Sequence, residues 1–464
     1  MAGFVVTTLR EETALPQRET TRESGDCLIR SSHYCVLGKG RRLTYRGGDS
    51  HAQSMRRLIR RAGLALLALV CCGSSLAADA GTADSTQRQI ALIENRLKER
   101  PHDFIAFTRL GDLQSRRAHE TGDLRIYLNA EAAFTAALKE FPDYAGALAG
   151  LASVRMALHR FAEAADLAER VLQHDRNHTE ARLLLVDAQI ALGNEDAAAV
   201  MLAKLADSPA VFARRAELSR LRGDNAGAIR LLLRASDESD ARGEPPPNVS
   251  WYRVRAGEML FASGKFDLSE EQYRRALDSW PESYAAAEHV AELLGAREKF
   301  DEAVVLYEKL IAQSSRPDLQ QALGDLYVFM RKPEQAEHCY DKALAGYLAS
   351  VQRGEVHFIH HLAGFYSDAR ENGKEAVKWA RKDLELRHTP AAHDALAWAL
   401  YRAGQFGDAR AEIDAALRTG ISNAHILNHA SFIYSAAGDL ERGRQCMRET
   451  AAVNPRYNSF HVHR

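Results

Sequence analysis

The sequence lacks the short motifs that commonly mark a catalytic domain. It contains no phosphate-binding G-x-x-x-x-G-K-[ST] loop, no zinc-binding H-E-x-x-H pair, no G-x-S-x-G nucleophile elbow and no C-x-x-C pair. The segments outside the periodic region described below are too short to form a catalytic domain. We therefore expect neither an enzyme activity nor a bound cofactor.

Long apolar runs are also scarce. Ala62–Cys72 is an apolar run of eleven residues, well short of the roughly 20 that a membrane-spanning helix needs. It follows the basic segment Met55–Arg61 and precedes small residues at Ser75 and Ala77. Residues 55–77 therefore resemble a secretory signal peptide, which predicts a periplasmic or secreted mature chain without a membrane span. The alternative is a membrane anchor formed by an uncleaved signal. Residues 1–54 show no apolar periodicity, and we expect them to be an untranslated or disordered extension.

A large excess of either charge is absent too. The formal net charge of the whole chain is -1, and residues 78–464 carry 49 basic and 56 acidic side chains. A slightly acidic surface repels a phosphate backbone on average, whereas nucleic-acid binding depends on clustered Lys and Arg. We expect no nucleic-acid partner.

The clearest pattern present is a repeat, which is most easily seen in Asp318–Leu344. This stretch carries apolar residues at helical spacing in two successive segments, with Pro333 at the start of the second, where a missing backbone N–H is tolerated. A small or short side chain recurs in the first segment of each unit, roughly every 34 residues, at Gly111, Ala152, Val186, Ala216, Gly257, Ala291, Gly324, Ala363, Ala397 and Ser431. A second one follows about twelve residues later, at Ala130, Ala164, Ala198, Ala228, Ser269, Ala303, Ala336, Ala376, Ala409 and Gly443.

A period of 34 residues with two helices per unit resembles the tetratricopeptide-repeat (TPR) family. The resemblance covers roughly residues 86–457 and implies an all-α, right-handed superhelical solenoid of about ten helix-turn-helix repeats. We expect an N-terminal capping helix in residues 78–100, repeats one to four in 101–235 and repeats five to ten in 251–457. Residues 236–250 are polar and contain three consecutive prolines, which predicts a loop between the two groups of repeats. Residues 458–464 form a histidine-containing tail.

Cysteine is nearly absent from the repeats. Cys339 and Cys446 are the only two, and they occupy equivalent positions three repeats apart. Helices lie 8–10 Å apart in such arrays, so this separation exceeds the distance that a disulfide can bridge. We expect both to be packing residues.

The family resemblance implies that the first helix of each repeat lines a concave groove. The residues it places there are Asp187, Glu217, Glu258, Glu288, Glu292, Asp325, His360, Asp394, Trp398, Tyr401, Asn428 and Phe432. This groove changes from acidic in the early repeats to aromatic and imidazole-rich in repeats eight to ten. It predicts a protein or peptide partner that is basic and has an apolar anchor. The alternative is that acidic residues at these positions are simply common in the family.

Histidine is concentrated late in the chain. His357 with His361, and His425 with His429, are spaced i, i+4, which places two imidazoles on one helical face. Imidazole favours zinc, copper or nickel, and Asp394 is a carboxylate adjacent in sequence to another of the late histidines, His393. Ordinary surface or groove histidines are the alternative to a metal site.

Two hypotheses of function follow. The first is a non-enzymatic interaction scaffold of the bacterial periplasm that binds a peptide or protein segment in the groove. The second is a periplasmic metal-handling accessory protein that uses the C-terminal histidines. A subunit of an enzyme whose active site lies on another chain is a third possibility.

Overall fold

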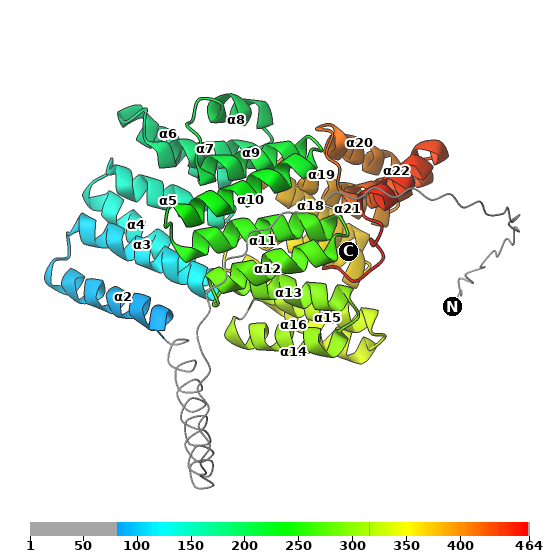
Figure 1. Ribbon diagram of the computed structural model, residues 1–464, viewed down its shortest axis with the longest axis horizontal. Coiled ribbons are helices and arrows are strands. Elements are labelled where there is room, and N and C mark those ends of the chain that lie inside the picture. Colours follow the sequence, from blue (N-terminus) through cyan, green and yellow to red (C-terminus); the bar gives the residue numbers. More distant parts are fainter. Residues whose placement is uncertain (1–80, 315, 463–464) are drawn as a thin grey trace, which may run out of the picture. The chain divides into compact units, whose positions relative to one another are not determined.

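The computed structural model describes residues 81–314 and 316–462, which form helices joined by short turns (Figure 1). These residues contain 21 α-helices, one π-helical turn and no strand. The predicted all-α solenoid is confirmed. The predicted extension, residues 1–54, and the predicted signal peptide, residues 55–77, lie outside the described residues. Among the described helices, none has both the length and the apolar character that a membrane crossing requires.

After a first helix, α2, the helices follow one another as ten consecutive pairs. The bounds are α2 Gly81–Glu99; α3 Phe104–Thr121 and α4 Arg125–Glu140; α5 Ala145–Ala157 and α6 Phe161–His174; α7 Thr179–Ala191 and α8 Glu195–Leu202; α9 Pro209–Leu221 and α10 Asn225–Ala241; α11 Pro246–Ala262 and α12 Phe266–Ser279; α13 Tyr284–Ala296 and α14 Phe300–Gln313; α15 Pro317–Phe329 and α16 Pro333–Gln352; α17 Ile359–Gly364, with the π-helical turn Phe365–Ala369, and α18 Gly373–Leu386; α19 Pro390–Arg402 and α20 Phe406–Leu417; α21 Ala424–Ala436 and α22 Leu440–Val453.

The recurring small residues allow the two helices of a repeat to pack closely. A Cβ atom on Gly257 of α11 would lie 2.3 Å from Cε1 of Tyr273 in α12. A Cβ atom on Gly324 of α15 would lie 2.6 Å from Cε1 of Tyr340 in α16. Both distances are too short for a real side chain, so each glycine provides the space that the aromatic ring of the second helix fills. Both tyrosines are buried.

The predicted loop over residues 236–250 is wrong in its extent. Helix α10 continues to Ala241 and α11 begins at Pro246, so only residues 242–245 separate them. Pro246 and Pro247 occupy the first turn of α11, where the backbone N–H groups have no partner within the helix and proline is tolerated. The polar residues at the end of α10 also suit a helix, because their buried hydroxyls have partners: Ser236 donates to the carbonyl of Val249 in α11, and Ser239 donates to Glu244 in the connection.

Repeat eight is the least regular pair. The extra residues before it lengthen α16, which runs for 20 residues and ends before Gly354, a residue with a φ of 79°. Its first helix, α17, changes to a π-helical turn at Phe365. Asp383 of α18 is buried where a small apolar residue is expected, and it accepts hydrogen bonds from Arg387 at 2.8–3.0 Å. A buried carboxylate is retained here because an arginine one turn later neutralises it.

Residues in or near the interhelix connections of early repeats contact residues of much later repeats. His119 stacks on Trp280 with ring centroids 5.4 Å apart, and the rings of His159 and His360 are 5.3 Å apart. The backbone N–H of His388 donates to the carbonyl of Ala191 at 3.1 Å. We call these contacts, together with those described next, the cross-turn contacts.

The remaining cross-turn contacts join repeats four and five to the end of the array. Asn225 Nδ2, at the start of α10, donates to the carbonyl of Ser422 at 2.7 Å. Gly264 approaches Asn454 so closely that a Cβ atom would lie 2.5 Å from its Oδ1. Residues of α7 to α9 also share one hydrophobic cluster with residues of α16 to α22. The described repeats therefore pack on more than their immediate neighbours.

Cys339 and Cys446 are buried free thiols within hydrophobic clusters. The prediction that they are packing residues is confirmed.

Candidate functional site

A row of carboxylates extends along the first helices of repeats three to seven. Contacts join α7 to α9 and α11 to α13, and five of the carboxylates directly follow the recurring small or short residue of their repeat, namely Asp187, Glu217, Glu258, Glu292 and Asp325. The row consists of Asp187 on α7, Glu217 on α9, Glu258 on α11, Glu288 and Glu292 on α13, and Asp318 and Asp325 on α15. We call it the charged row. Six of its members are predicted site residues, and Asp318 is one that the sequence analysis missed.

Arginine neutralises much of the charged row. The ion pairs formed with the first three carboxylates are Asp187 with Arg214, Glu217 with Arg220, and Glu258 with Arg255. Arg214 comes from the next repeat, whereas Arg220 and Arg255 lie three residues from their partners on the same helix, where side chains share a face. The charged row is therefore a series of ion pairs rather than a line of free carboxylates.

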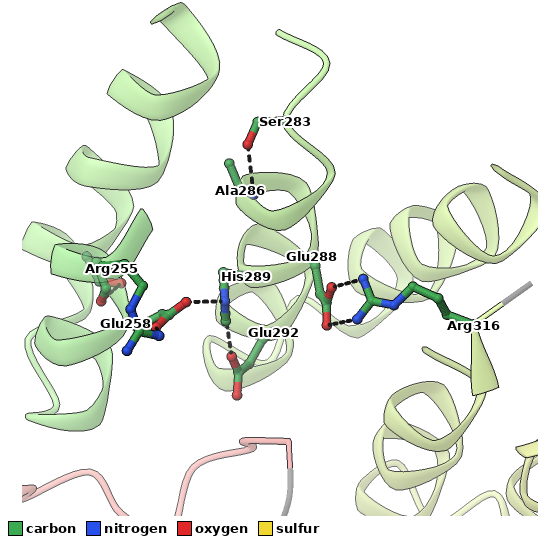
Figure 2. Close-up of polar contacts among 10 residues, drawn as sticks. Arg255, Glu258, Ser283, Ala286, Glu288, His289, Glu292 and Arg316 are labelled. Atoms are coloured by element: carbon green, nitrogen blue, oxygen red, sulfur yellow. Dashed lines mark hydrogen bonds and ion pairs between the residues drawn. The ribbon is translucent and has the colours of Figure 1, made fainter. Parts of the chain in front are cut away.

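His289 links two carboxylates of the row (Figure 2). Its Nε2 lies 2.8 Å from Oε1 of Glu258, and its Nδ1 lies 3.2 Å from Oε2 of Glu292. Burial alone would lower the pKa of His289, but the charges of Glu258 and Glu292 raise it to about 10. Burial alone would raise the pKa of Glu258, but Arg255 and His289 lower it to about 2. His289 is consequently a cation at neutral pH.

Arg316 forms a second bridge at the start of α15. Its guanidinium lies 3.0 Å from Oε2 of Glu288 (Figure 2) and also contacts Asp318, which is 5% exposed. Burial alone would lower the pKa of Arg316, but Glu288 and Asp318 raise it above its usual value. Asp325 has a different kind of partner, because it accepts a hydrogen bond from the hydroxyl of Tyr340 at 2.7 Å.

Seven carboxylates face four arginines and one histidinium, so the charged row stays net negative.

The predicted site residues of repeats nine and ten form a second group around Trp398. The ring of Trp398 stacks on His429 at 4.1 Å and on Tyr401 at 4.9 Å, and Phe432 approaches its edge at 6.2 Å. Asp394 lies beneath this stack and contacts His429 Nδ1 at 3.1 Å. We call these five residues the aromatic group. Of the two other predicted residues, Asn428 uses its carbonyl to accept from Ser431, and His360 contacts His159 and His361 instead.

The two predicted histidine pairs differ in what surrounds them. His361 stacks on Tyr347, and His357 lies 3.9 Å from Glu355. Both rings also lie near Phe358, with centroids 4.3 Å away for His357 and 5.8 Å away for His361. His425 and His429 instead lie 4.1 Å apart, between ring centroids. Within the described residues, one set of three potential metal ligands has all its ligand atoms within 4.8 Å, and it consists of Asp394, His425 and His429.

The segment of residues 455–462 lies against α13 of the charged row and also contacts His425 of α21. Phe460 is 2% exposed and packs against Gly295, where a Cβ atom would lie 2.5 Å from its Cδ1. The backbone N–H of Val462 donates to Oε1 of Glu292 at 2.9 Å, and the Arg456 guanidinium lies 5.0 Å above the ring of Phe266. A cavity of about 380 Å³ remains beside the segment, lined by residues that include Glu258, Phe261, His289, His425 and Tyr457.

Sequence reasoning missed this segment and the arginines of the charged row. The arginines were visible in part, since Arg220 follows Glu217 and Arg255 precedes Glu258 by three residues, a spacing that places both side chains on one helical face. The segment gave a weaker signal, namely the apolar residues Phe460 and Val462 within a polar tail. Nothing in the periodicity could show that it folds back onto α13, because it lies beyond the last repeat.

Sequence models of the tetratricopeptide repeat match residues 116–173, 155–222, 254–317 and 317–345 of this chain. No curated protein sequence matches the chain significantly.

Several solved structures of helical-repeat proteins are similar at low identity. Yeast Tom70 is 12% identical with a TM-score of 0.33, over 76% of this chain and 85% of that chain. The human IFIT1 dimer with PPP-AAAA is 15% identical with a TM-score of 0.35, over 78% of each chain. A tetratricopeptide repeat protein from Parabacteroides merdae is 18% identical with a TM-score of 0.31, over 52% of this chain and 91% of that chain. These likenesses are too remote to indicate a ligand or a partner.

Proposed function

We propose, from the premise that this chain contains tetratricopeptide repeats, that it is a non-enzymatic protein-interaction scaffold. Its binding surface consists of the charged row of repeats five to seven and the aromatic group of repeats nine and ten. The ligand is an extended segment of another polypeptide, carrying an aromatic or apolar anchor.

The observation that carries this proposal is the position of residues 455–462. The chain itself already lays a short segment along this surface, with one aromatic side chain buried and one backbone N–H bonded to Glu292. Recognition of an extended peptide generally combines such main-chain hydrogen bonds with a pocket for one side chain. Phe460 fills the pocket here, and Gly295 provides the space for its ring.

The charge of the partner follows from the balance of the charged row. Because arginine and His289 offset most of the carboxylates, apolar burial supplies more of the affinity than charge does. The remaining negative charge favours a basic segment and acts mainly on the rate of encounter, which salt slows. We therefore propose a mildly basic partner whose anchor resembles Phe460.

The experiment uses residues 78–464 and a labelled peptide with the sequence of Arg456–Val462. In the Phe460→Ala variant the internal segment loses its anchor, so the peptide should bind to the vacated surface. Binding is measured as a rise in the fluorescence anisotropy of the labelled peptide. The unchanged chain should bind the same peptide at least tenfold more weakly, because its own segment competes. Burial of one Phe side chain is worth roughly 1.5–3 kcal/mol, which is about a 10- to 100-fold change in affinity.

The matched control is the same peptide with alanine in place of Phe460. It should not bind either protein detectably if the aromatic ring is the anchor. Adding Gly295→Leu to the Phe460→Ala variant should abolish binding of the original peptide, because the leucine fills the place of the ring. Equal binding of both peptides, or no binding to the Phe460→Ala variant, would contradict the proposal.

We also propose that the chain is exported to the bacterial periplasm. The support is the basic segment, apolar run and small-residue end of residues 55–77. N-terminal sequencing of protein recovered from a periplasmic fraction should find a chain that begins near Ala78. Recovery of the chain in the cytoplasm only, with residues upstream of Met55 attached, would refute this.

A further inference from the structure

We propose that Asp394, His425 and His429 form a binding site for a divalent transition-metal ion, of the type that takes Zn²⁺. The site has three protein ligands and an open fourth position. It shares Asp394 and His429 with the aromatic group, but the evidence for an ion here does not rest on the peptide-binding proposal.

The ligand atoms come from two neighbouring helices. His425 and His429 are one turn apart on α21, and their imidazoles project from the same face, with ring centroids 4.1 Å apart. Asp394 projects toward them from α19, with Oδ1 3.1 Å from Nδ1 of His429 and Oδ2 4.0 Å from Nε2 of His425. Zinc bonds to nitrogen and oxygen are about 2.0–2.2 Å long, so tetrahedral ligand atoms lie roughly 3.3 Å apart. The two measured separations bracket that value.

The hydrogen bonding of His425 also suits a metal ligand. The hydroxyl of Tyr457 lies 3.3 Å from Nδ1 of His425, on the opposite side of the ring from the nitrogen that faces Asp394. Histidine ligands normally use one ring nitrogen for the metal and hold the other in a hydrogen bond that fixes the orientation of the ring. Tyr457 can do this for His425.

Packing fixes the position of His429. Its ring is 4% exposed and lies parallel to the indole of Trp398, with an angle of 4° between the ring planes. Trp398 is itself held by a hydrogen bond from its Nε1 to Asp368 at 2.9 Å. A ligand restrained in this way loses little freedom when an ion binds, which favours affinity.

An ordinary hydrogen-bonded histidine explains this arrangement less well. A single imidazole would satisfy Asp394, yet two imidazoles face it in a largely buried place. The pair His357 and His361 provides the contrast, because within the described residues it belongs to no set of three potential ligands whose ligand atoms lie this close together. His425 also lines the cavity beside residues 455–462, which gives an ion a route to the site.

The test is calorimetric titration of chelator-treated residues 78–464 with Zn²⁺. We expect one ion per chain with a dissociation constant below about 1 µM. Asp394→Asn, which preserves the shape of the side chain, and His425→Gln should each weaken binding at least tenfold. Tyr457→Phe should weaken it by about tenfold, as is usual for the loss of a group that orients a ligand.

The matched control is His357→Gln with His361→Gln, which removes two imidazoles at the same spacing. It should leave the affinity for Zn²⁺ unchanged, and circular dichroism should show that every variant remains folded. As a second readout, Co²⁺ should give the visible absorption bands of a four-coordinate site in the unchanged chain, and His425→Gln should remove them. Absence of Zn²⁺ binding, or equal binding by the control and the site variants, would overturn the proposal.

Discussion

The charged row of repeats three to seven and the aromatic group of repeats nine and ten both lie on the first helices of their repeats, yet they satisfy their polar atoms in different ways. In the first, each carboxylate meets an arginine, a histidinium or a tyrosine hydroxyl. In the second, a single carboxylate, Asp394, faces two imidazoles, and one of them, that of His429, stacks on the indole of Trp398. One repeating backbone therefore supports both a surface whose charge is largely offset by ion pairs and a cluster of side chains that matches the donor set of a metal site.

The largest effect that separates the two regions should follow from Arg316→Met. This change leaves Glu288 and Asp318 without their cation at a position where the arginine side chain is 16% exposed. Removing one partner of a buried ion pair costs about 3–5 kcal/mol, because the remaining charge stays desolvated. Urea unfolding at pH 7 measures this loss.

Arg274→Met is the control for that experiment. Arg274 forms an ion pair with Glu270, but its side chain is 72% exposed. Exposed pairs contribute about 0–1 kcal/mol. Equal losses for Arg316→Met and Arg274→Met would show that the charged row is merely a solvated surface.

His289→Gln should have a smaller effect that depends on pH. The pKa of His289 is raised to about 10, so its stabilising contribution is complete below the ordinary value near 6.5 and is lost as the pH rises toward 10. The pKa of Glu258 is lowered to about 2, so its contribution is present above about pH 4.5 and is lost as the pH falls. The variant loses the charge-assisted hydrogen bonds to the two glutamates, so the chain with His289 should be more stable by about 1.5–3 kcal/mol between pH 4.5 and 6.5.

This difference should shrink steadily as the pH rises from 6.5 to 10, and denaturant unfolding across that range measures it. His102→Gln is the control, since His102 has a side chain that is 79% exposed beside Glu140. A difference between the chain and His289→Gln that does not change with pH would show that His289 is not held as a cation by the two glutamates.

Trp398→Phe should have the smallest effect and acts on the aromatic group alone. Phenylalanine keeps an aromatic face against His429 but loses the hydrogen bond to Asp368. One hydrogen bond contributes about 0.5–1.5 kcal/mol, so a loss near 1 kcal/mol is expected. Phe432→Leu, at a ring that is 43% exposed, should change the stability by less than half of that. A larger loss from Phe432→Leu would mean that Trp398 is not the centre of the group.

Periodicity alone was enough to predict the helices, because each repeat must bury the same face against the next. Gly257 and Gly324 are examples, since only a residue without a Cβ admits the tyrosine opposite. The proline-rich stretch was predicted incorrectly, because Pro246 and Pro247 read as a break although a first helical turn accommodates both.

The sequence was enough to list many residues of the candidate site, but not to predict how they are arranged in space. The spacing of His425 and His429 placed two imidazoles on one face, but it could not distinguish them from His357 and His361, which share that spacing. The distinction depends on Asp394, which a different helix brings to within 3.1 Å of His429. Contacts of this kind join residues that are about one repeat or more apart in the chain. They do not alter the periodic pattern of the sequence, so that pattern cannot reveal them.

The cross-turn contacts change how the array should respond to force and to truncation. Repeat arrays whose units contact only their neighbours can extend elastically under force. They can also lose a terminal unit with little effect on the stability of distant units. Here Asn225 donates a hydrogen bond to Ser422, and the backbone N–H of His388 donates one to Ala191. Repeats that are far apart in the sequence are therefore joined by direct hydrogen bonds. Stretching the array must break these hydrogen bonds before the repeats can separate. Removal of repeat ten should also destabilise repeat four, which lies nearly 200 residues away along the chain.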